Sequence, residues 1–306
     1  MVTIVMRYRS VVLLATGVVA GLAAGLLLTG TPAIGQEQAP YQAPRSIYGD
    51  GRPDLNGIWQ ALTTANWNVE AHPSSPGYSD GPAWMLGALV AEPGGLGVVE
   101  GGRIPYQPWA FERRNENFRN RLVADVYKRE QGDGELKCFM PGPVRATYMP
   151  YPFQILQTDK YVNISYQFAN SNRIIHLTNH QEPVVDGWMG WSNGRWEGDA
   201  LVVEVVGLMA ELWLDRSGNF LGEGARVTER YTRIGPDHLR YEATIENPKV
   251  FTRPWTISLP LYRHIDPRAE IVEFNCVEYA EETMFGRVTR DWTPPTWDPF
   301  TQQTIE

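Results

Sequence analysis

From Tyr148 onward the chain consists of short runs in which apolar and polar residues alternate, separated by turns of Gly, Pro, Asp and Asn. A period of two places successive side chains on opposite faces of a strand, so the pattern predicts a series of half-buried β-strands. The clearest hairpin is WEGDALVVEVV, with Gly198 and Asp199 at its turn. The predicted strands are 57–62, 153–157, 162–168, 173–177, 194–197, 201–206, 227–233, 239–246, 256–263 and 271–279.

Short strands at this spacing favour a closed antiparallel barrel of about 8–10 strands, which has room for a ligand. One helix is predicted over residues 107–130, and residues 61–105, rich in Gly and Pro, predict long loops. We therefore expect a mainly-β fold with a single barrel domain over residues 51–306, its strands mainly within 153–279. The apolar residues of the helix that fall near a 3.6-residue repeat are Trp109, Phe111, Phe118, Leu122 and Val126.

The N-terminal residues have the features of a secretory leader. Arg7 and Arg9 precede an apolar run over residues 11–28, and small residues follow at Ala33 and Gly35. This pattern predicts a signal peptide over residues 1–35, then a Gln-, Pro- and Ala-rich linker over 36–50, and a periplasmic or secreted protein. The alternative is an uncleaved membrane anchor, since the run approaches the length of a spanning helix. Membrane contact is expected only in that case.

Composition and motifs exclude several classes of function. A net charge of −8 and a pI near 5.3, without clustered Lys and Arg, argue against a nucleic-acid partner. The sequence has no P-loop, no GxSxG, no GxGxxG after a strand, no HExxH and no CxxC. His176 and His180 have a four-residue spacing, but they lie where a strand runs into a loop, so their side chains need not converge. We expect no cofactor and no metal site.

The two cysteines, Cys138 and Cys276, permit one pairing. An exported protein lives where disulfides persist, and a bridge between these residues would contribute about 4–5 kcal/mol in the chain-entropy model. We expect the bridge; the alternative is two buried thiols.

Charged residues inside the predicted strands are the candidate chemical groups. One interpretation is simple alternation, with the charges on a solvated outer face. The other is that some line the barrel interior, where a carboxylate must be paired or protonated. In that case Glu229, Glu242 and His176 are candidate catalytic acids or bases. Arg173 and Arg230 would then hold the polar end of a ligand.

Aromatic residues gather in the segments that connect the strands. Trp188, Trp191 and Trp213 lie there and predict a hydrophobic mouth that takes a small hydrophobic or aromatic molecule.

Several motifs resemble a large family of exported bacterial proteins, mostly of unassigned activity. They are DLNGIWQ, ATYMPYPFQI, GRWEGDALVVEV, WLDRSGNF, ERYTR, YEATIENPKVFTRPW and FNCVEYAEE, and the resemblance covers nearly the whole mature chain. Proteins of this family often carry a His-Ser pair before the strand that holds ERY, where this chain has Leu221 and Gly222. If that histidine is catalytic in the family, this protein has lost or changed the activity. A weaker resemblance, Gly57-x-Trp59 at a first strand, is to lipocalin-like barrels and implies their fold.

Three functions are compatible with these observations. The first is an exported lipocalin-like protein that binds a small hydrophobic or aromatic molecule in its barrel. The second is a cofactor-independent hydratase, isomerase, cyclase or lyase that acts on a terpenoid- or phenol-like substrate through Glu and His groups in the barrel. The third is an envelope-assembly protein that uses the surface of its sheet.

Overall fold

A computed structural model describes residues 41–74, 92–121, 131–278, 297–298 and 303–304. Residues 41–306 form one unit. The predicted signal peptide, residues 1–35, lies outside the described residues. The elements of the barrel unit are β1 (Gly57–Ala61), α2 (Pro108–Arg119), η2 (Gly134–Lys137), α3 (Gly142–Tyr148), β2 (Phe153–Gln157), β3 (Tyr161–Tyr166), η3 (Phe168–Asn170), β4 (Asn172–His176), β5 (Trp191–Glu197), β6 (Ala200–Val206), β7 (Arg226–Gly235), β8 (His238–Glu246), β9 (Trp255–Arg263), β10 (Trp297–Asp298) and β11 (Gln303–Thr304).

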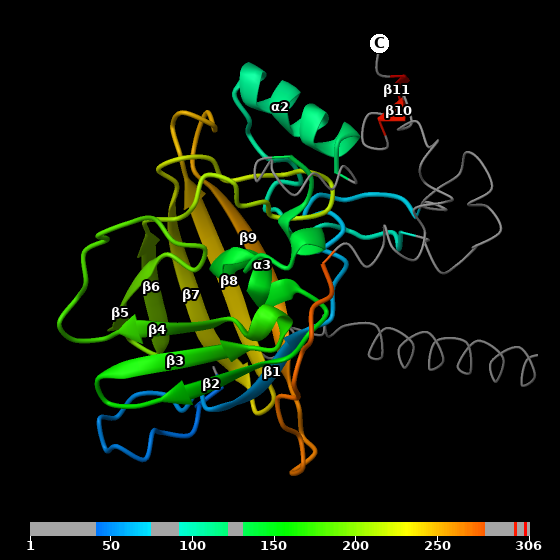
Figure 1. Cartoon of the computed structure of the whole chain (residues 1–306). Helices are drawn as coiled ribbons and strands as arrows, with labels where there is room; N and C mark the ends of the chain where they lie inside the picture. Colours follow the sequence, from blue (N-terminus) through cyan, green and yellow to red (C-terminus); the bar gives the residue numbers. More distant parts are fainter. Residues whose placement is uncertain (1–40, 75–91, 122–130, 279–296, 299–302, 305–306) are drawn as a thin grey trace, which may run out of the picture. The chain divides into compact units, whose positions relative to one another are not determined.

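Strands β1 to β9 form a closed barrel in sequence order, and β9 pairs with β1 to complete it (Figure 1). The expected mainly-β barrel is confirmed, but the expectation of a wholly antiparallel barrel is wrong at one pair. Strands β4 and β5 run parallel, with Ile175 opposite Ser192. The connection over residues 177–190 must therefore return along the barrel wall, because a parallel pair cannot be joined by a tight hairpin.

The two ends of the barrel are built differently. At one end, which we call the hairpin end, short connections over residues 158–160, 198–199 and 236–237 join consecutive strands, including the predicted turn at Gly198 and Asp199. At the other end, which we call the capped end, two long connections join consecutive strands: residues 62–152 between β1 and β2, and residues 207–225 between β6 and β7. Helix α3, which lies within the connection 62–152, is therefore positioned at the capped end.

Trp59 closes the hairpin end. Its side chain is fully buried, its Nε1 donates to the carbonyl of Leu55, and the Arg233 guanidinium lies over its ring, 5.9 Å from the centroid. Arg233 in turn donates to the carbonyls of Asp54 and Pro236. Gly57 has a φ of +145°, and a Cβ there would lie 3.3 Å from Trp59 Nε1, so this position near the plug favours glycine.

The helices differ from the prediction in two ways. Helix α2 covers the first half of the predicted 107–130, and residues 122–130 lie outside the described part. Helix α3, a second helix that the sequence did not predict, has seven residues that are all buried. A helix buried on every side shows no amphipathic repeat, which explains why periodicity missed it.

Two further segments depart from expectation. Residues 271–278, predicted as a strand, have no regular secondary structure, because β9 pairs with β1 and leaves no open edge for another strand. The predicted linker over residues 36–50 is described from residue 41, and residues 41–50 fold back onto the barrel. Ala43 and Ser46 are buried, and Arg45 pairs with Asp199 at 2.6 Å.

Candidate functional site

A bidentate ion pair lies inside the barrel. On β4 the alternation places Arg173 and Ile175 inward, and on β7 it places Glu229 and Tyr231 inward. Arg173 Nη1 donates to Glu229 Oε2 at 2.6 Å, and Nη2 donates to Oε1 at 3.1 Å. The side chains of the two residues are 2% and 0% exposed, so the pair is closed to solvent.

Two tyrosine hydroxyls complete what we call the Arg173 cluster, namely Arg173, Glu229, Tyr231 and Tyr241. The Tyr231 hydroxyl accepts from Arg173 Nη2 at 2.9 Å and donates to Glu229 Oε1 at 3.1 Å. Tyr241, on β8, donates to the same oxygen at 2.8 Å. The carboxylate therefore accepts four hydrogen bonds, three at Oε1 and one at Oε2, which fix its position.

One donor of the cluster has no partner. Arg173 Nε is buried and donates to no atom of the described residues. A buried donor left unpaired costs about 1–3 kcal/mol, so such groups call for an explanation in a bound water or ligand.

Burial sets the charges of this cluster. It raises the pKa of Tyr231 and of Tyr241 well above the ordinary tyrosine value, so both hydroxyls stay neutral. Burial acts to lower the pKa of Arg173, but the adjacent Glu229 carboxylate outweighs it and raises that pKa well above the ordinary value. The cluster therefore consists of the Arg173–Glu229 ion pair and two neutral hydroxyls.

Three of the five charged residues proposed for the interior lie outside it. His176, Arg230 and Glu242 occupy the alternate strand positions and face outward, partly exposed. Arg230 pairs there with Glu197 at 2.9 Å. The interpretation of a charged interior therefore fits Arg173 and Glu229, while simple alternation explains the other three.

The three tryptophans lie in or beside the long connections, each with its own neighbours. Trp213 is buried in the core and bridges to Phe220. Trp188 packs on Phe139 with ring centroids 4.8 Å apart. Trp191 donates from Nε1 to the carbonyl of Val185 and stays partly exposed. Trp188 also packs against the hydrophobic core that contains Trp213, so these two rings lie on one apolar cluster.

A second buried charge cluster lies in the connections of the capped end. Arg145, on α3, donates to both oxygens of Asp133 at 2.6 and 2.8 Å and to Glu135 at 2.7 Å. Arg216 also pairs with Glu135, and Arg145 Nε donates to Asn66. Burial acts to raise the pKa of Glu135, but Arg216 and Arg145 together hold it at about 2.

The loop WLDRSGNF folds around Asp215. The buried carboxylate accepts from the backbone N–H groups of Val69, Ser217 and Asn219 and from Asn219 Nδ2. Burial nevertheless raises the pKa of Asp215 to about 6. Since each partner is a loop group, the role of Asp215 is to hold residues 215–219 against residues 68–69.

Helix α3 connects the two clusters. Thr147 Oγ1 lies 3.3 Å from the hydroxyl of Tyr166. Burial raises the pKa of Tyr166, while the nearby Arg173 acts to lower it and Glu229 to raise it. Arg145, two residues earlier and so on the opposite side of the helix, binds Asp133 and Glu135. The helix therefore covers the Arg173 cluster with one face and is held by an ion-pair network on the other.

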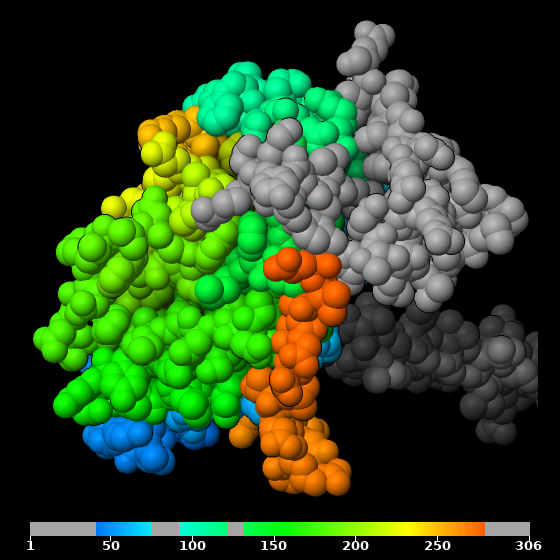
Figure 2. Space-filling model, in the orientation of Figure 1, coloured from blue at the N-terminus to red at the C-terminus, as the bar shows by residue number. Residues whose placement is uncertain are grey.

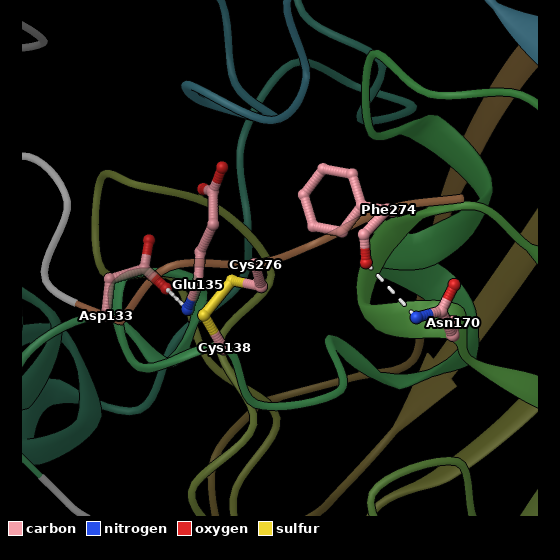
Figure 3. The surroundings of a disulfide bond; sticks show 6 residues. All are labelled: Asp133, Glu135, Cys138, Asn170, Phe274 and Cys276. Atoms are coloured by element: carbon pink, nitrogen blue, oxygen red, sulfur yellow. Dashed lines mark hydrogen bonds between the residues drawn. A yellow bond between two sulfur atoms is a disulfide. The ribbon is translucent and has the colours of Figure 1, made fainter. Parts of the chain in front are cut away.

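A disulfide fastens the segment that precedes α3. Cys138 is bonded to Cys276, as predicted, and the bridge fits an oxidising compartment outside the cytoplasm (Figure 3).

We call residues 264–278 the strap; this segment runs over the surface of the barrel unit and is orange in Figure 2. Besides the disulfide, Phe274 anchors it: its carbonyl accepts from Asn170 Nδ2 (Figure 3), and its ring packs on Tyr151.

Four residues in or beside the Arg173 cluster were not predicted as site residues, namely Tyr166, Tyr231, Tyr241 and Thr147. Alternation alone could have found Tyr231, which shares a face with Glu229, and Tyr241, which shares one with Ala243 and Ile245. Thr147 gave no such signal, since α3 itself was not predicted.

Within the described ranges, no helix has the length and apolar character needed to cross a membrane. In the same residues no three His, Cys, Asp or Glu side chains are grouped so that they could hold a metal ion. No model of a protein family matches the chain, and no curated protein matches it either.

Proposed function

We propose that this protein is an exported, lipocalin-like barrel that binds a small hydrophobic or aromatic molecule, with the polar end of that molecule at the Arg173 cluster. The observation that carries the proposal is the unpaired Nε–H of Arg173, a buried donor in a barrel core that is otherwise mostly apolar. Binding sites for small molecules are mostly apolar, with a few polar groups that orient the ligand. A ligand oxygen at Nε would satisfy the donor that the described protein atoms leave free.

The lipocalin-like description is supported by the closed end of the barrel. Gly57 and Trp59 on β1, with Arg233 over the Trp59 ring, plug the hairpin end. The nine strands and the parallel β4–β5 pair distinguish this barrel from a purely antiparallel one. Export to the periplasm or beyond is supported by the leader-like residues 1–35 and by the disulfide.

The geometry favours binding over the alternative of a hydratase, isomerase, cyclase or lyase. An acid–base role needs a carboxylate that can exchange a proton with the substrate. Glu229 already accepts four hydrogen bonds from Arg173, Tyr231 and Tyr241, and Glu242 and His176 face outward. The interior carboxylate is therefore arranged to hold Arg173 in place.

Native mass spectrometry of the protein purified from its own host tests the proposal. We expect the wild type to carry a bound molecule of defined mass that is released on unfolding. The double variant Arg173→Met/Glu229→Leu, which replaces the pair by apolar side chains of similar volume, should lack it. The outward-facing variant Arg230→Met serves as the matched control and should retain it. Equal amounts of the adduct in the wild type and the double variant, or none in either, would count against binding at this site.

A further inference from the structure

The Arg173 cluster also restricts the charge of the ligand. Arg173 and Glu229 neutralise each other through both guanidinium Nη atoms and both carboxylate oxygens. The cluster has no net charge to offer an ion, and its members are fully or almost fully buried.

A ligand carboxylate would therefore enter at a large cost. It would lose its hydration without gaining an unpaired cation, and it would lie near the Glu229 carboxylate. A ligand cation would meet the positive charge of Arg173 in the same way. Only an uncharged group avoids both penalties.

The free hydrogen-bonding capacity of Arg173 specifies the kind of uncharged group. Arg173 Nε–H is a donor without an acceptor among the described residues. An acceptor oxygen on the ligand would satisfy it, whereas a hydrocarbon would leave it unpaired.

We propose that the barrel selects a neutral hydrophobic ligand that carries an acceptor oxygen, a ketone or aldehyde carbonyl above all, and that it discriminates against carboxylates. This selectivity rests on the proposed binding function and adds a chemical class to it. A single buried water on Nε is the competing occupant, and it would make the barrel indifferent to the ligand's oxygen.

The test uses three probes on one aromatic skeleton, which are methyl naphthyl ketone, naphthoate and ethylnaphthalene, titrated into the full-length protein by calorimetry at neutral pH. We expect the ketone to bind at least about tenfold more tightly than either of the others, because it alone pairs with the buried donor without bringing a charge. Binding of all three with equal affinity, or preference for naphthoate, would overturn the selectivity and leave binding intact. If none of the three binds and native mass spectrometry also finds no adduct, the binding function itself is wrong.

A charge-changing variant sharpens the test. Glu229→Gln removes the negative charge and leaves Arg173 unneutralised, so naphthoate should gain at least about tenfold in affinity and become the preferred probe. Glu242→Gln, on the outer face of β8, is the matched control and should keep the order of the wild type. An unchanged preference in a folded Glu229→Gln protein contradicts the proposal. If that variant does not fold, the comparison of the three probes on the wild type still tests whether the barrel prefers a neutral ketone to a carboxylate.

Discussion

Arg173 on β4 and Glu229 on β7, 56 residues apart in the sequence, form a bidentate ion pair inside a closed barrel. Neither charge reaches solvent, and each charge neutralises the other. The pair is thus both a fixed point of the fold and the place where the proposed ligand finds a strong donor.

Replacing one partner of this ion pair should destabilise the protein more than replacing both partners. We expect Glu229→Gln to lower the free energy of unfolding by about 3–5 kcal/mol, because it leaves the guanidinium of Arg173 buried and uncompensated. The double variant Arg173→Met/Glu229→Leu leaves no buried charge and should cost less than Glu229→Gln, its remaining loss coming from the Tyr231 and Tyr241 hydroxyls, which lose their acceptor. Urea denaturation of both, with outward-facing Glu242→Gln as the control, measures the difference. A double variant that loses as much stability as Glu229→Gln would contradict the view that the loss in the single variant comes from the uncompensated charge of Arg173.

The stability of the barrel should depend on the volume of the side chain at position 59, which closes the hairpin end. Trp59 is fully buried, so Trp59→Ala should lower the free energy of unfolding by about 3–5 kcal/mol, and Trp59→Phe by less. Thermal unfolding followed by circular dichroism would report this order. A loss below about 1 kcal/mol in Trp59→Ala would mean that the ring is not part of the core.

The disulfide should stabilise the capped end without being required for the barrel. Its two cysteines are 138 residues apart, and a loop of that length corresponds to about 4–5 kcal/mol in the chain-entropy model. We expect the double variant Cys138→Ser/Cys276→Ser to retain β-sheet circular dichroism and to lose hydrogen-exchange protection first in residues 131–149. Residues 131–149 that stay as well protected as β7 and β8 in the variant would contradict the view that the bridge anchors this segment.

Asp215 predicts a pH dependence of stability. Its pKa is raised from 3.8 to about 6 by burial, so the folded state holds a proton that the unfolded state has lost between these values. This contribution is fully present below pH 3.8 and is lost as the pH rises through about 6. Between about pH 4.5 and 7 the wild type should lose on the order of 2 kcal/mol relative to Asp215→Asn. Glu135, whose pKa falls from an ordinary 4.5 to about 2 in the folded protein, titrates mostly below this range. A difference between wild type and variant that is constant with pH would show that Asp215 does not titrate there.

The strands could be predicted because alternation is a local property of the sequence. The boundaries of β2 agree with the prediction, and those of the other barrel strands differ by a few residues at most. The parallel β4–β5 pair could not be predicted in this way, since pairing depends on where a connection returns and not on the strands themselves. The strand predicted at 271–279 failed for a related reason, because the closure of β9 on β1 is a long-range event.

The candidate site could be predicted only in part. Alternation along β7 places Glu229 on the inner face with Val227 and Tyr231, and it places Arg230 on the outer face. The prediction of one interior set that held both Glu229 and Arg230 therefore combined residues from opposite faces of the strand. That Arg173 meets Glu229 follows from closure of the barrel, which no local pattern contains. The second buried charge cluster, in which Arg145 binds Asp133 and Glu135, depends on loops that join distant parts of the chain, and it gave no signal in the sequence.

The most direct test of the central claim is the nitrogen–proton NMR signal of Arg173 Nε–H during titration with methyl naphthyl ketone. The signal is assigned by its disappearance in the Arg173→Met/Glu229→Leu variant. If the ligand's oxygen binds this donor, the signal should shift in proportion to occupancy with the ketone, and to a much smaller extent with ethylnaphthalene. A ketone that binds the protein while the Arg173 signal stays unchanged would place the ligand elsewhere and contradict the account.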